Sequence, residues 1–463
     1  MNTPFPCGQI HPLRTRREML QQLSCGFGAL AFTALTAHKA AAAETNPLAP
    51  KPTHFAARAK RVIFLCMRGG PSHVDTFDYK PRLVADDGKP GRRPGSVWLA
   101  PKGKFAQHGK GGLWISDLFP NVAKHADALC LLRSMHTEVP AHPQAFLRLH
   151  TGTAQFVRPS LGAWTLYGLG TANENLPGFV TLTPPSGFGG AQNYGSAFLP
   201  AIHQGTRVGA DNRPVAQAEV KNLKAPGAAE AQRLELELIQ SFNREALRLD
   251  PRNAQIEGVI QSYELAFRMQ SQMPAVMDLT KETAATQQLY GIGDRATEDF
   301  GRKCLLARRM VEAGVRFVEI CHGNWDHHFN LSTTLRNSCT SVDKPIAGLL
   351  ADLAARGMLK DTLVIWGGEF GRTPYAQGSD GRDHNHKGFT LWMAGGGVKG
   401  GHSHGATDEF GHEAVQDKVS IHDLHATILH LLGLDHERLT FPHAGRDFRL
   451  TDVHGDVLKT ILA

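Results

Sequence analysis

The sequence predicts an α/β protein built on a doubly wound, mostly parallel sheet with helices on both faces. Four apolar runs, at 61–67, 315–321, 362–366 and 389–394, each end close to glycine residues. Continuous rather than alternating hydrophobicity indicates strands that are buried on both faces, as in parallel sheets. Amphipathic helical stretches alternate with these runs, and such alternation is typical of doubly wound sheets.

Helices are predicted between and after these strands. Apolar side chains recur three and four positions apart in three stretches, which is the spacing of one helix face. Two of the stretches stop at a glycine, Gly357 and Gly433, as many helices do. The apolar positions are Leu306, Met310 and Ala313; Ile346, Leu349, Leu350 and Leu353; and Leu424, Ile428, Leu431 and Leu432.

Residues 1–43 are expected to be a twin-arginine export signal. The pair Arg16-Arg17 precedes an apolar run at 23–37, and three alanines at 41–43 offer a cleavage site. The apolar run has 15 residues, whereas a membrane-spanning helix needs about 20. We therefore expect a periplasmic or secreted protein without a stable membrane anchor after cleavage, and an uncleaved anchor is the alternative.

The rest of the chain is expected to form a short arm and one large domain. Residues 44–59 are rich in proline and alanine and are interpreted as an N-terminal arm. Residues 60–463 are assigned to the α/β domain, with a helical insertion packed on it at about 228–298. The apolar faces of its two helices are Leu234, Leu238 and Phe242, and Ile256, Val259, Ile260, Tyr263 and Phe267.

The charge gives no indication of a nucleic-acid partner. The formal net charge is +7 at pH 7, and part of it lies in the signal and in the stretch 102–110. No run of basic residues is interleaved with aromatic residues. A basic surface is compatible with the steering of anionic substrates.

The cysteines do not indicate a disulfide framework. Five remain after removal of the predicted signal, which is an odd number, and no C-x-x-C pair occurs. Three of them, Cys66, Cys130 and Cys321, lie in apolar runs and are interpreted as small core residues.

Clusters of histidine, carboxylate and arginine residues follow the predicted strands, and these side chains are the candidates for metal binding and catalysis. Asp326 and His328 come after one strand, and Glu369 and Arg372 follow the next. Imidazole and carboxylate groups bind zinc, manganese or iron, which a hydrolase uses to activate water. A capped surface turn is the alternative for the first pair, and a buried Glu–Arg ion pair that orients a loop is the alternative for the second.

Further candidates lie just before the last strand and after the first. Asp383, His384 and His386 precede the run at 389–394, and only one of the two histidines would face a metal on an extended segment. Of these, His386 is favoured, with the other in a supporting role. Asp75 follows the first strand and is a candidate ligand or a helix N-cap. Because ligands of doubly wound sheets bind beyond the carboxyl ends of strands, one shared site is predicted.

Three motifs connect the chain to a known family. They are GGPSHVDTFD at 69–78, WGGEFGRTP at 366–374 and GRDHN at 381–385. With them, the chain from about residue 60 to its end resembles the exported bacterial family called domain of unknown function 1501, which is placed in the alkaline phosphatase and sulfatase superfamily. The resemblance implies a doubly wound sheet and a site that usually holds two metals.

The resemblance also implies roles for particular residues. His386 is similar to the late metal histidine of the superfamily, and Asp326 with His328 is similar to its Asp/His ligand pair. Glu369 stands at the position of its Asp-His pair, although phenylalanine follows it here. His142 stands where the hydroxyl nucleophile is expected, and Arg68 where an early metal aspartate is expected.

These departures leave three readings open. In the first, water activated by the metal attacks the substrate directly. In the second, His142 acts as a metal ligand or as the nucleophile. In the third, the fold binds a ligand without catalysing a reaction. The C-x-P-x-R sulfatase motif is also missing.

We therefore predict an exported metal-dependent hydrolase that acts on an anionic sulfate or phosphate ester, carried by a small molecule or a polysaccharide. The metal is expected to be zinc, with manganese, calcium or iron as alternatives. His142 and Arg372 are the predicted catalytic residues, the latter stabilising an oxyanion. The predicted metal ligands are Asp75, Asp326, His328, Glu369, Asp383, His384 and His386. The alternatives are a non-catalytic protein that binds anionic glycans and a metal site that only stabilises the fold.

Overall fold

The computed structural model describes residues 48–218, 220, 228–250 and 253–463. The predicted export signal at 1–43 and the first part of the predicted arm lie outside the described residues. No helix among the residues that the structure describes is long and apolar enough to cross a membrane.

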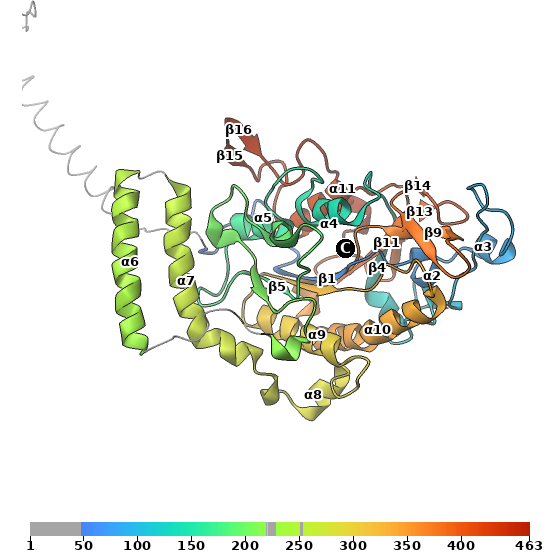
Figure 1. Cartoon of the computed structure of the whole chain (residues 1–463), viewed down its shortest axis with the longest axis horizontal. Helices are drawn as coiled ribbons and strands as arrows, with labels where there is room; N and C mark the ends of the chain where they lie inside the picture. Colours follow the sequence, from blue (N-terminus) through green and yellow to red (C-terminus); the bar gives the residue numbers. More distant parts are fainter. Residues whose placement is uncertain (1–47, 219, 221–227, 251–252) are drawn as a thin grey trace, which may run out of the picture. The chain divides into compact units, whose positions relative to one another are not determined.

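A sheet forms the centre of the fold (Figure 1). It has eight strands in the order β12-β4-β11-β8-β1-β7-β5-β6. Five of its strand pairs are parallel, and β11 is antiparallel to both of its neighbours. The predicted doubly wound, mostly parallel sheet is thereby confirmed. The strands are β1 (Arg61–Met67), β4 (Leu129–Met135), β5 (Phe179–Leu182), β6 (Thr206–Val208), β7 (Phe317–His322), β8 (Thr362–Gly367), β11 (Phe389–Ala394) and β12 (His402–His404).

Both faces of the sheet are covered by helices, as predicted. In β1, Ile63 and Leu65 belong to one buried apolar cluster, and Val62 and Phe64 belong to the other, because successive side chains of a strand point to opposite faces. Helices α9 and α10 cover the first face, and α4, α5 and α11 cover the second (Figure 1). The helices are α4 (His142–Thr151), α5 (Leu161–Leu169), α9 (Glu298–Glu312), α10 (Leu331–Ala355) and α11 (Ile421–Leu431).

The reversed direction of β11 decides which loops meet. Strands β4, β7 and β8 all end at one edge of the sheet, and β11 begins at that same edge because it runs the opposite way. Residues that follow the three parallel strands therefore lie beside residues that precede β11. The site described below is built at this edge.

The smaller elements surround the sheet. Helices α2 (His73–Thr76) and α3 (Pro81–Ala85) follow β1 in the chain, and α8 (Ala284–Leu289) precedes α9. Four antiparallel pairs complete the fold: β2 (Phe105–His108) with β3 (Leu113–Ser116), β9 (Gly371–Ala376) with β10 (Arg382–Asn385), β13 (Ala406–Thr407) with β14 (Ala414–Gln416), and β15 (Phe441–His443) with β16 (Arg446–Phe448).

Two long helices, α6 (Ala229–Leu249) and α7 (Ala254–Met277), occupy the predicted helical stretch (Figure 1). The expectation that the apolar face of α6 packs on the sheet domain is wrong, because Leu234, Leu238 and Phe242 are exposed. Helix α7 instead buries Ile260 and Met273. An amphipathic pattern marks a face that is able to pack, but it does not say what covers that face.

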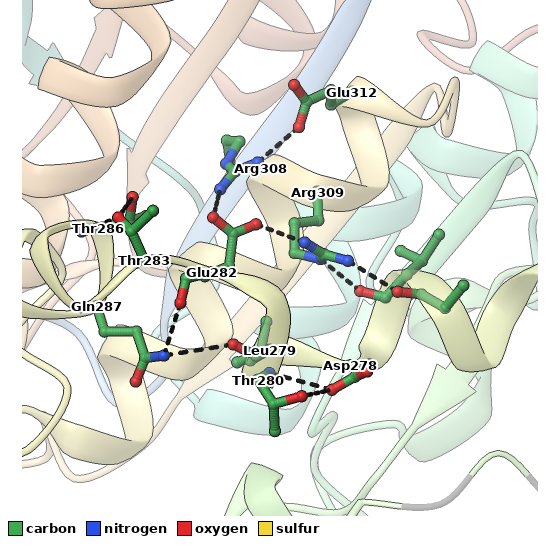
Figure 2. A network of polar contacts seen from close by, with 12 residues as sticks. Asp278, Leu279, Thr280, Glu282, Thr283, Thr286, Gln287, Arg308, Arg309 and Glu312 are labelled. Atoms are coloured by element: carbon green, nitrogen blue, oxygen red, sulfur yellow. Dashed lines mark hydrogen bonds and ion pairs between the residues drawn. The ribbon is translucent and has the colours of Figure 1, made fainter.

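A polar network fixes the segment after α7 against α9. Figure 2 shows the Glu282 carboxylate between two guanidinium groups, with Arg308 Nη2 at 2.8 Å and Arg309 Nη1 at 2.5 Å. Arg309 also donates to the main-chain oxygen of Val276 at 2.8 Å. Burial raises the pKa of Glu282, but the hydrogen bonds from Arg309 and Arg308 outweigh it, so that the pKa is lowered.

Candidate metal centre

Four side chains that are far apart in the sequence converge at the edge of the sheet. His142 is the first residue of α4, Asp326 and His328 lie in the loop after β7, and His384 lies in β10. One ligand atom from each lies within 4.8 Å of those from the other three. We call these four residues the outer cluster.

The carboxylate oxygen Oδ1 of Asp326 is the centre of the outer cluster. Nε2 of His328 lies 2.8 Å from it, Nε2 of His142 3.2 Å and Nε2 of His384 3.4 Å. The Nε2 atoms of His328 and His384 are 3.0 Å apart. Two ligand atoms bound to one tetrahedral zinc ion at about 2.0 Å lie about 3.3 Å apart. The four atoms are therefore spaced as ligands of a single cation.

A different acceptor holds the far side of each imidazole ring. Nδ1 of His142 donates to Glu369 at 2.6 Å, and Nδ1 of His384 donates to the carbonyl oxygen of Pro140 at 2.9 Å. Nδ1 of His328 donates to the side-chain oxygen of Gln377. Carboxylate and carbonyl oxygens only accept, so the ring proton lies on Nδ1. Such outer partners are typical of metal-binding histidines.

The tautomers have a direct consequence for the centre of the site. With the proton on Nδ1, the neutral rings of His328 and His384 point the lone pairs of Nε2 at each other across 3.0 Å. Nε2 of His142 is also buried, and it faces Oδ1 of Asp326 at 3.2 Å. Nitrogen lone pairs and a carboxylate that face one point need a cation or a proton between them. The donor set of imidazole and carboxylate fits zinc, manganese or iron.

Two buried side chains hold the outer cluster in place. Glu369 is fully buried behind His142 and accepts the main-chain N–H of Gly69 at 3.0 Å. Arg372 is also fully buried, donates to the carbonyl oxygen of Gly70 at 3.0 Å and forms an ion pair with Asp326. The guanidinium thus binds the ligand carboxylate and the main chain after β1.

The charges of the site favour an ionised carboxylate. Burial raises the pKa of Asp326, but contacts with His142 and His384 and the positive charge of Arg372 bring it well below its ordinary value. Burial lowers the pKa of His142, yet its contacts with Asp326 and Glu369 leave it raised. The two carboxylates therefore stabilise positive charge at this point, whether a proton or a metal ion carries it.

Comparison with known proteins settles the family. The family model described as "Protein of unknown function (DUF1501)" matches residues 59–462. The chain belongs to the DUF1501 family. A search of the curated proteins finds no match.

The DUF1501 chain is also similar to several solved structures. One is the sulfatase PsFucS1 from Pseudoalteromonas sp., at 14% identity over 83% of this chain and 69% of that chain, with a TM-score of 0.38. Another is the lipoteichoic acid synthase LtaP from Listeria monocytogenes, at 8% identity over 88% and 79%, with a TM-score of 0.38. A third is an alkaline phosphatase from the Antarctic bacterium TAB5, at 11% identity over 81% and 98%, with a TM-score of 0.33. Similarity at these TM-scores adds no argument about the chemistry of the site.

Two cavities adjoin the outer cluster of this DUF1501 protein. Asp326 lines a cavity of about 600 Å³ together with Asn324 and Ser338. His384 lines a second cavity of about 370 Å³, whose other lining residues include Arg92, Arg93, His386 and Lys387. The cluster is therefore accessible from two sides, one of them rich in positive charge.

Four predicted ligands do not join the outer cluster, and one of them, Glu369, instead accepts a hydrogen bond from Nδ1 of His142. Both oxygens of Asp75 are occupied, since Arg382 donates to one at 2.7 Å and the main-chain N–H of Lys102 donates to the other at 2.7 Å. Asp383 forms an ion pair with Arg93 at 3.0 Å. His386 lines the smaller cavity without reaching Asp326.

The preference for His386 over His384 is corrected by the register of the β9–β10 pair. His384 is the direct partner of Arg372 across this pair, and Arg372 binds Asp326. Of the two histidines, the structure therefore brings His384 to the carboxylate. The pairing register was not visible in the sequence.

Some contributors to the site were missed in the sequence. Gln377 and the carbonyl group of Pro140 hold two of the rings, and nothing in their local sequence marks them. Glu319 could have been noticed, because it is a carboxylate inside an otherwise apolar strand.

Proposed function

We propose that this protein is an exported metal-dependent hydrolase that acts on an anionic sulfate or phosphate ester. The observation that carries the proposal is the convergence of three imidazole Nε2 atoms on the carboxylate of Asp326. A divalent metal held there would supply Lewis-acid charge and lower the pKa of a water molecule. Zinc is the expected metal, and His142, Asp326, His328 and His384 are the proposed ligands.

The protein's own residues prepare this site. Glu369, Gln377 and Pro140 orient the three rings, and Arg372 holds Asp326. Ligands that are held in advance lose little freedom when the metal binds, so this second layer raises metal affinity. The donors of Arg372 are engaged with Asp326 and the main chain, which supports a positioning role in place of the predicted oxyanion contact.

The cavity beside His384 supports an anionic substrate. Arg92, Arg93 and Lys387 line it. Arg93 is paired with Asp383, and Arg92 lies 3.6 Å from Asp408, whereas Lys387 makes no ion pair with any residue that the structure describes. A sulfate or phosphate group that enters beside His384 would gain charge-assisted hydrogen bonds from these side chains.

The number of ligands constrains the mechanism. Four protein ligands fill a tetrahedral zinc ion, which is typical of structural sites, whereas catalytic sites keep one position open. The side chain of Asp326 is 44% exposed on the cavity of about 600 Å³. The proposal therefore requires a fifth position on that side, or the exchange of one ligand for substrate.

A non-catalytic protein that binds anionic glycans is the second candidate. A cavity of about 700 Å³ beside α4 is lined by Arg148, Arg158, Arg449 and Trp164, and it shares Pro140 with the cavity of His384. Guanidinium groups next to aromatic rings suit sulfated or phosphorylated sugars. This candidate predicts that a sulfated oligosaccharide still binds after Asp326→Ala and that no ester is turned over.

Metal content is the decisive first experiment. Purified protein is analysed by mass spectrometry for bound metal, beside Asp326→Ala, His328→Ala and the control His386→Ala. We expect the first two variants to lose one equivalent and the control to keep the wild-type content, because His386 lies outside the outer cluster. Equal metal content in all four proteins would refute the outer site.

Activity is then measured on the proteins of known metal content. A panel of sulfate and phosphate esters is offered to the wild type and to Asp326→Ala. Turnover by the wild type that disappears in the variant supports the hydrolase. Binding of a sulfated oligosaccharide by both proteins, without turnover, would favour the glycan-binding candidate.

A further inference from the structure

A second group of metal-binding side chains lies inside the protein, between α4 and the sheet. Cys66 of β1, His150 of α4 and Glu319 of β7 are all buried, and one ligand atom from each lies within 4.8 Å of those from the other two. Cys321 of β7 is the direct neighbour of Cys66 across the β1–β7 pair. We call these four residues the inner cluster.

The contacts within the inner cluster are short. Nε2 of His150 lies 2.6 Å from Oε1 of Glu319, and Sγ of Cys66 lies 3.9 Å from the same nitrogen. Sγ of Cys321 lies 3.4 Å from Oε1 of Glu319. One sulfur atom, one imidazole nitrogen and one carboxylate oxygen therefore face a common point, and Cys321 adds a second sulfur atom beside Glu319. Together the four side chains offer the donor types that bind zinc.

The orientation of His150 shows that something positive belongs at this point. Its Nδ1 donates to the carbonyl oxygen of Phe146 at 2.7 Å, so a neutral ring presents a lone pair on Nε2. That lone pair faces the carboxylate of Glu319, which also only accepts. Either a proton lies between the two groups, on the ring or on the carboxyl group, or a metal ion does.

The surroundings favour the metal ion. The apolar side chains of Phe64, Phe146 and Leu149 belong to the same buried layer, where an isolated carboxylate is strongly disfavoured. A proton would pair His150 with Glu319 but would leave Sγ of Cys66, 3.9 Å from Nε2 of His150, outside that pair. Thiolate and imidazole together are the donors that select zinc over magnesium or calcium.

We propose that Cys66, His150, Glu319 and Cys321 bind a structural zinc ion. The site has no open face, since all four residues are buried. The ion would therefore be taken up while the chain folds. It would also fix α4, the helix whose first residue is His142 of the outer cluster. The proposal is independent of the proposed function, because the two clusters share no side chain.

Cobalt substitution tests the inner site on the unaltered chain. The protein is produced with cobalt in place of zinc, and its near-ultraviolet absorption is measured. We expect a sulfur-to-cobalt charge-transfer band, because only the inner cluster contains cysteine. The band should persist in Asp326→Ala, which removes the outer carboxylate. Its absence from cobalt-loaded wild-type protein would overturn the proposal.

Zinc content and thiol chemistry give two further readings. We expect Cys66→Ser to lose one equivalent of zinc and the control Cys130→Ser, a buried cysteine outside both clusters, to lose none. An unchanged zinc content in Cys66→Ser would contradict the site. So would a disulfide between Cys66 and Cys321 in the purified wild type, found by peptide mass spectrometry, because it would remove both thiolates. If Cys66→Ser does not fold, the cobalt spectrum of the wild type decides.

Discussion

At the scale of single residues, the outer cluster separates the ligands from the groups that orient them. His142 would bind the proposed metal at Nε2, and it is held at Nδ1 by Glu369, which is fully buried. A change in the orienting group should therefore weaken metal binding without abolishing it. The same logic applies to Gln377 behind His328.

Glu369→Gln tests this separation. The amide keeps the size of the side chain and one accepting oxygen, but it removes the negative charge behind His142. We expect metal affinity at the outer site to fall by about 10- to 100-fold, measured by competition with a chromophoric chelator. Asp383→Asn is the control, because Asp383 pairs with Arg93 outside the cluster. An affinity equal to that of the wild type would show that Glu369 does not orient a ligand.

Gly69 links the main chain after β1 to the ligand loop. Its φ is +113°, and a Cβ atom there would lie 2.6 Å from the main-chain nitrogen of Asp326. Gly69→Ala should therefore displace Asp326 and weaken metal binding, although no ligand is changed. The control is Gly88→Ala, where φ is +74° and the added atom meets nothing within 4 Å. Because the control carries backbone strain without displacement, equal losses of metal in the two variants would contradict the prediction.

At the scale of elements, substitutions in α6 and α7 test whether the apolar face of α6 is exposed in solution. The Phe242 side chain is 67% exposed, whereas Ile260 of the neighbouring α7 is 7% exposed. We expect Phe242→Ser to change the free energy of unfolding by less than about 0.5 kcal/mol. Ile260→Ser should lower it by about 3 kcal/mol, because it leaves a cavity and buries a hydroxyl group. Both values come from denaturant unfolding, and a large effect of Phe242→Ser would mean that another surface covers this face in solution.

The contact between Glu282 and α9 should make stability depend on pH. Glu282→Gln removes the charge between Arg308 and Arg309, and we expect a loss of about 2 kcal/mol at pH 7. The loss stays below the 3–5 kcal/mol typical of broken buried pairs, since Arg308 keeps Asp352 at 2.9 Å and Glu312 at 2.6 Å.

The sign of the pH dependence follows from the lowered pKa of Glu282. A carboxyl group whose pKa is lower in the folded state stabilises the protein above its unfolded pKa of about 4.3 and loses that effect as pH falls through the folded pKa. The stability difference between wild type and Glu282→Gln should therefore be constant near neutral pH and shrink in acid. A difference that grows in acid would contradict the ionised Glu282.

At the scale of the whole molecule, hydrophobic patterning predicted the class of the sheet and four of its strands, but not β4, β5, β6 and β12 or the covering helices α4 and α5. The runs at 61–67 and 389–394 form β1 and β11 with the predicted bounds. The antiparallel direction of β11 was not predicted, because strand direction depends on the path of the connecting segment and leaves no mark in the run itself.

The site was predictable only in part. In a parallel sheet the carboxyl ends of the strands lie at one edge, so polar residues that follow predicted strands were expected to share a site. This reasoning identified Asp326, His328 and Glu369. The choice between His384 and His386 depended on the register of β9 with β10. The inner cluster depended on the register of β1 with β7 and on the packing of α4. The β9–β10 register joins segments that are near in the sequence, whereas the other two relations join segments that are far apart, and no local pattern encodes either kind.

The reversal of β11 also bears on how such a site could diversify. The chain leaves the sheet after β8 and returns in β11, its immediate neighbour, so the intervening excursion is anchored on strands about 4.8 Å apart. This single excursion carries Glu369, Arg372, Gln377 and His384. Its tip, at 378–381, is held against the segment after β7, since Asp380 accepts from Leu331 and Ser332 and a Cβ atom on Gly381 would meet the carbonyl group of His328. An insertion or deletion in this one excursion would therefore disturb the loop that carries Asp326 and His328 as well, while the strands of the sheet stay in place.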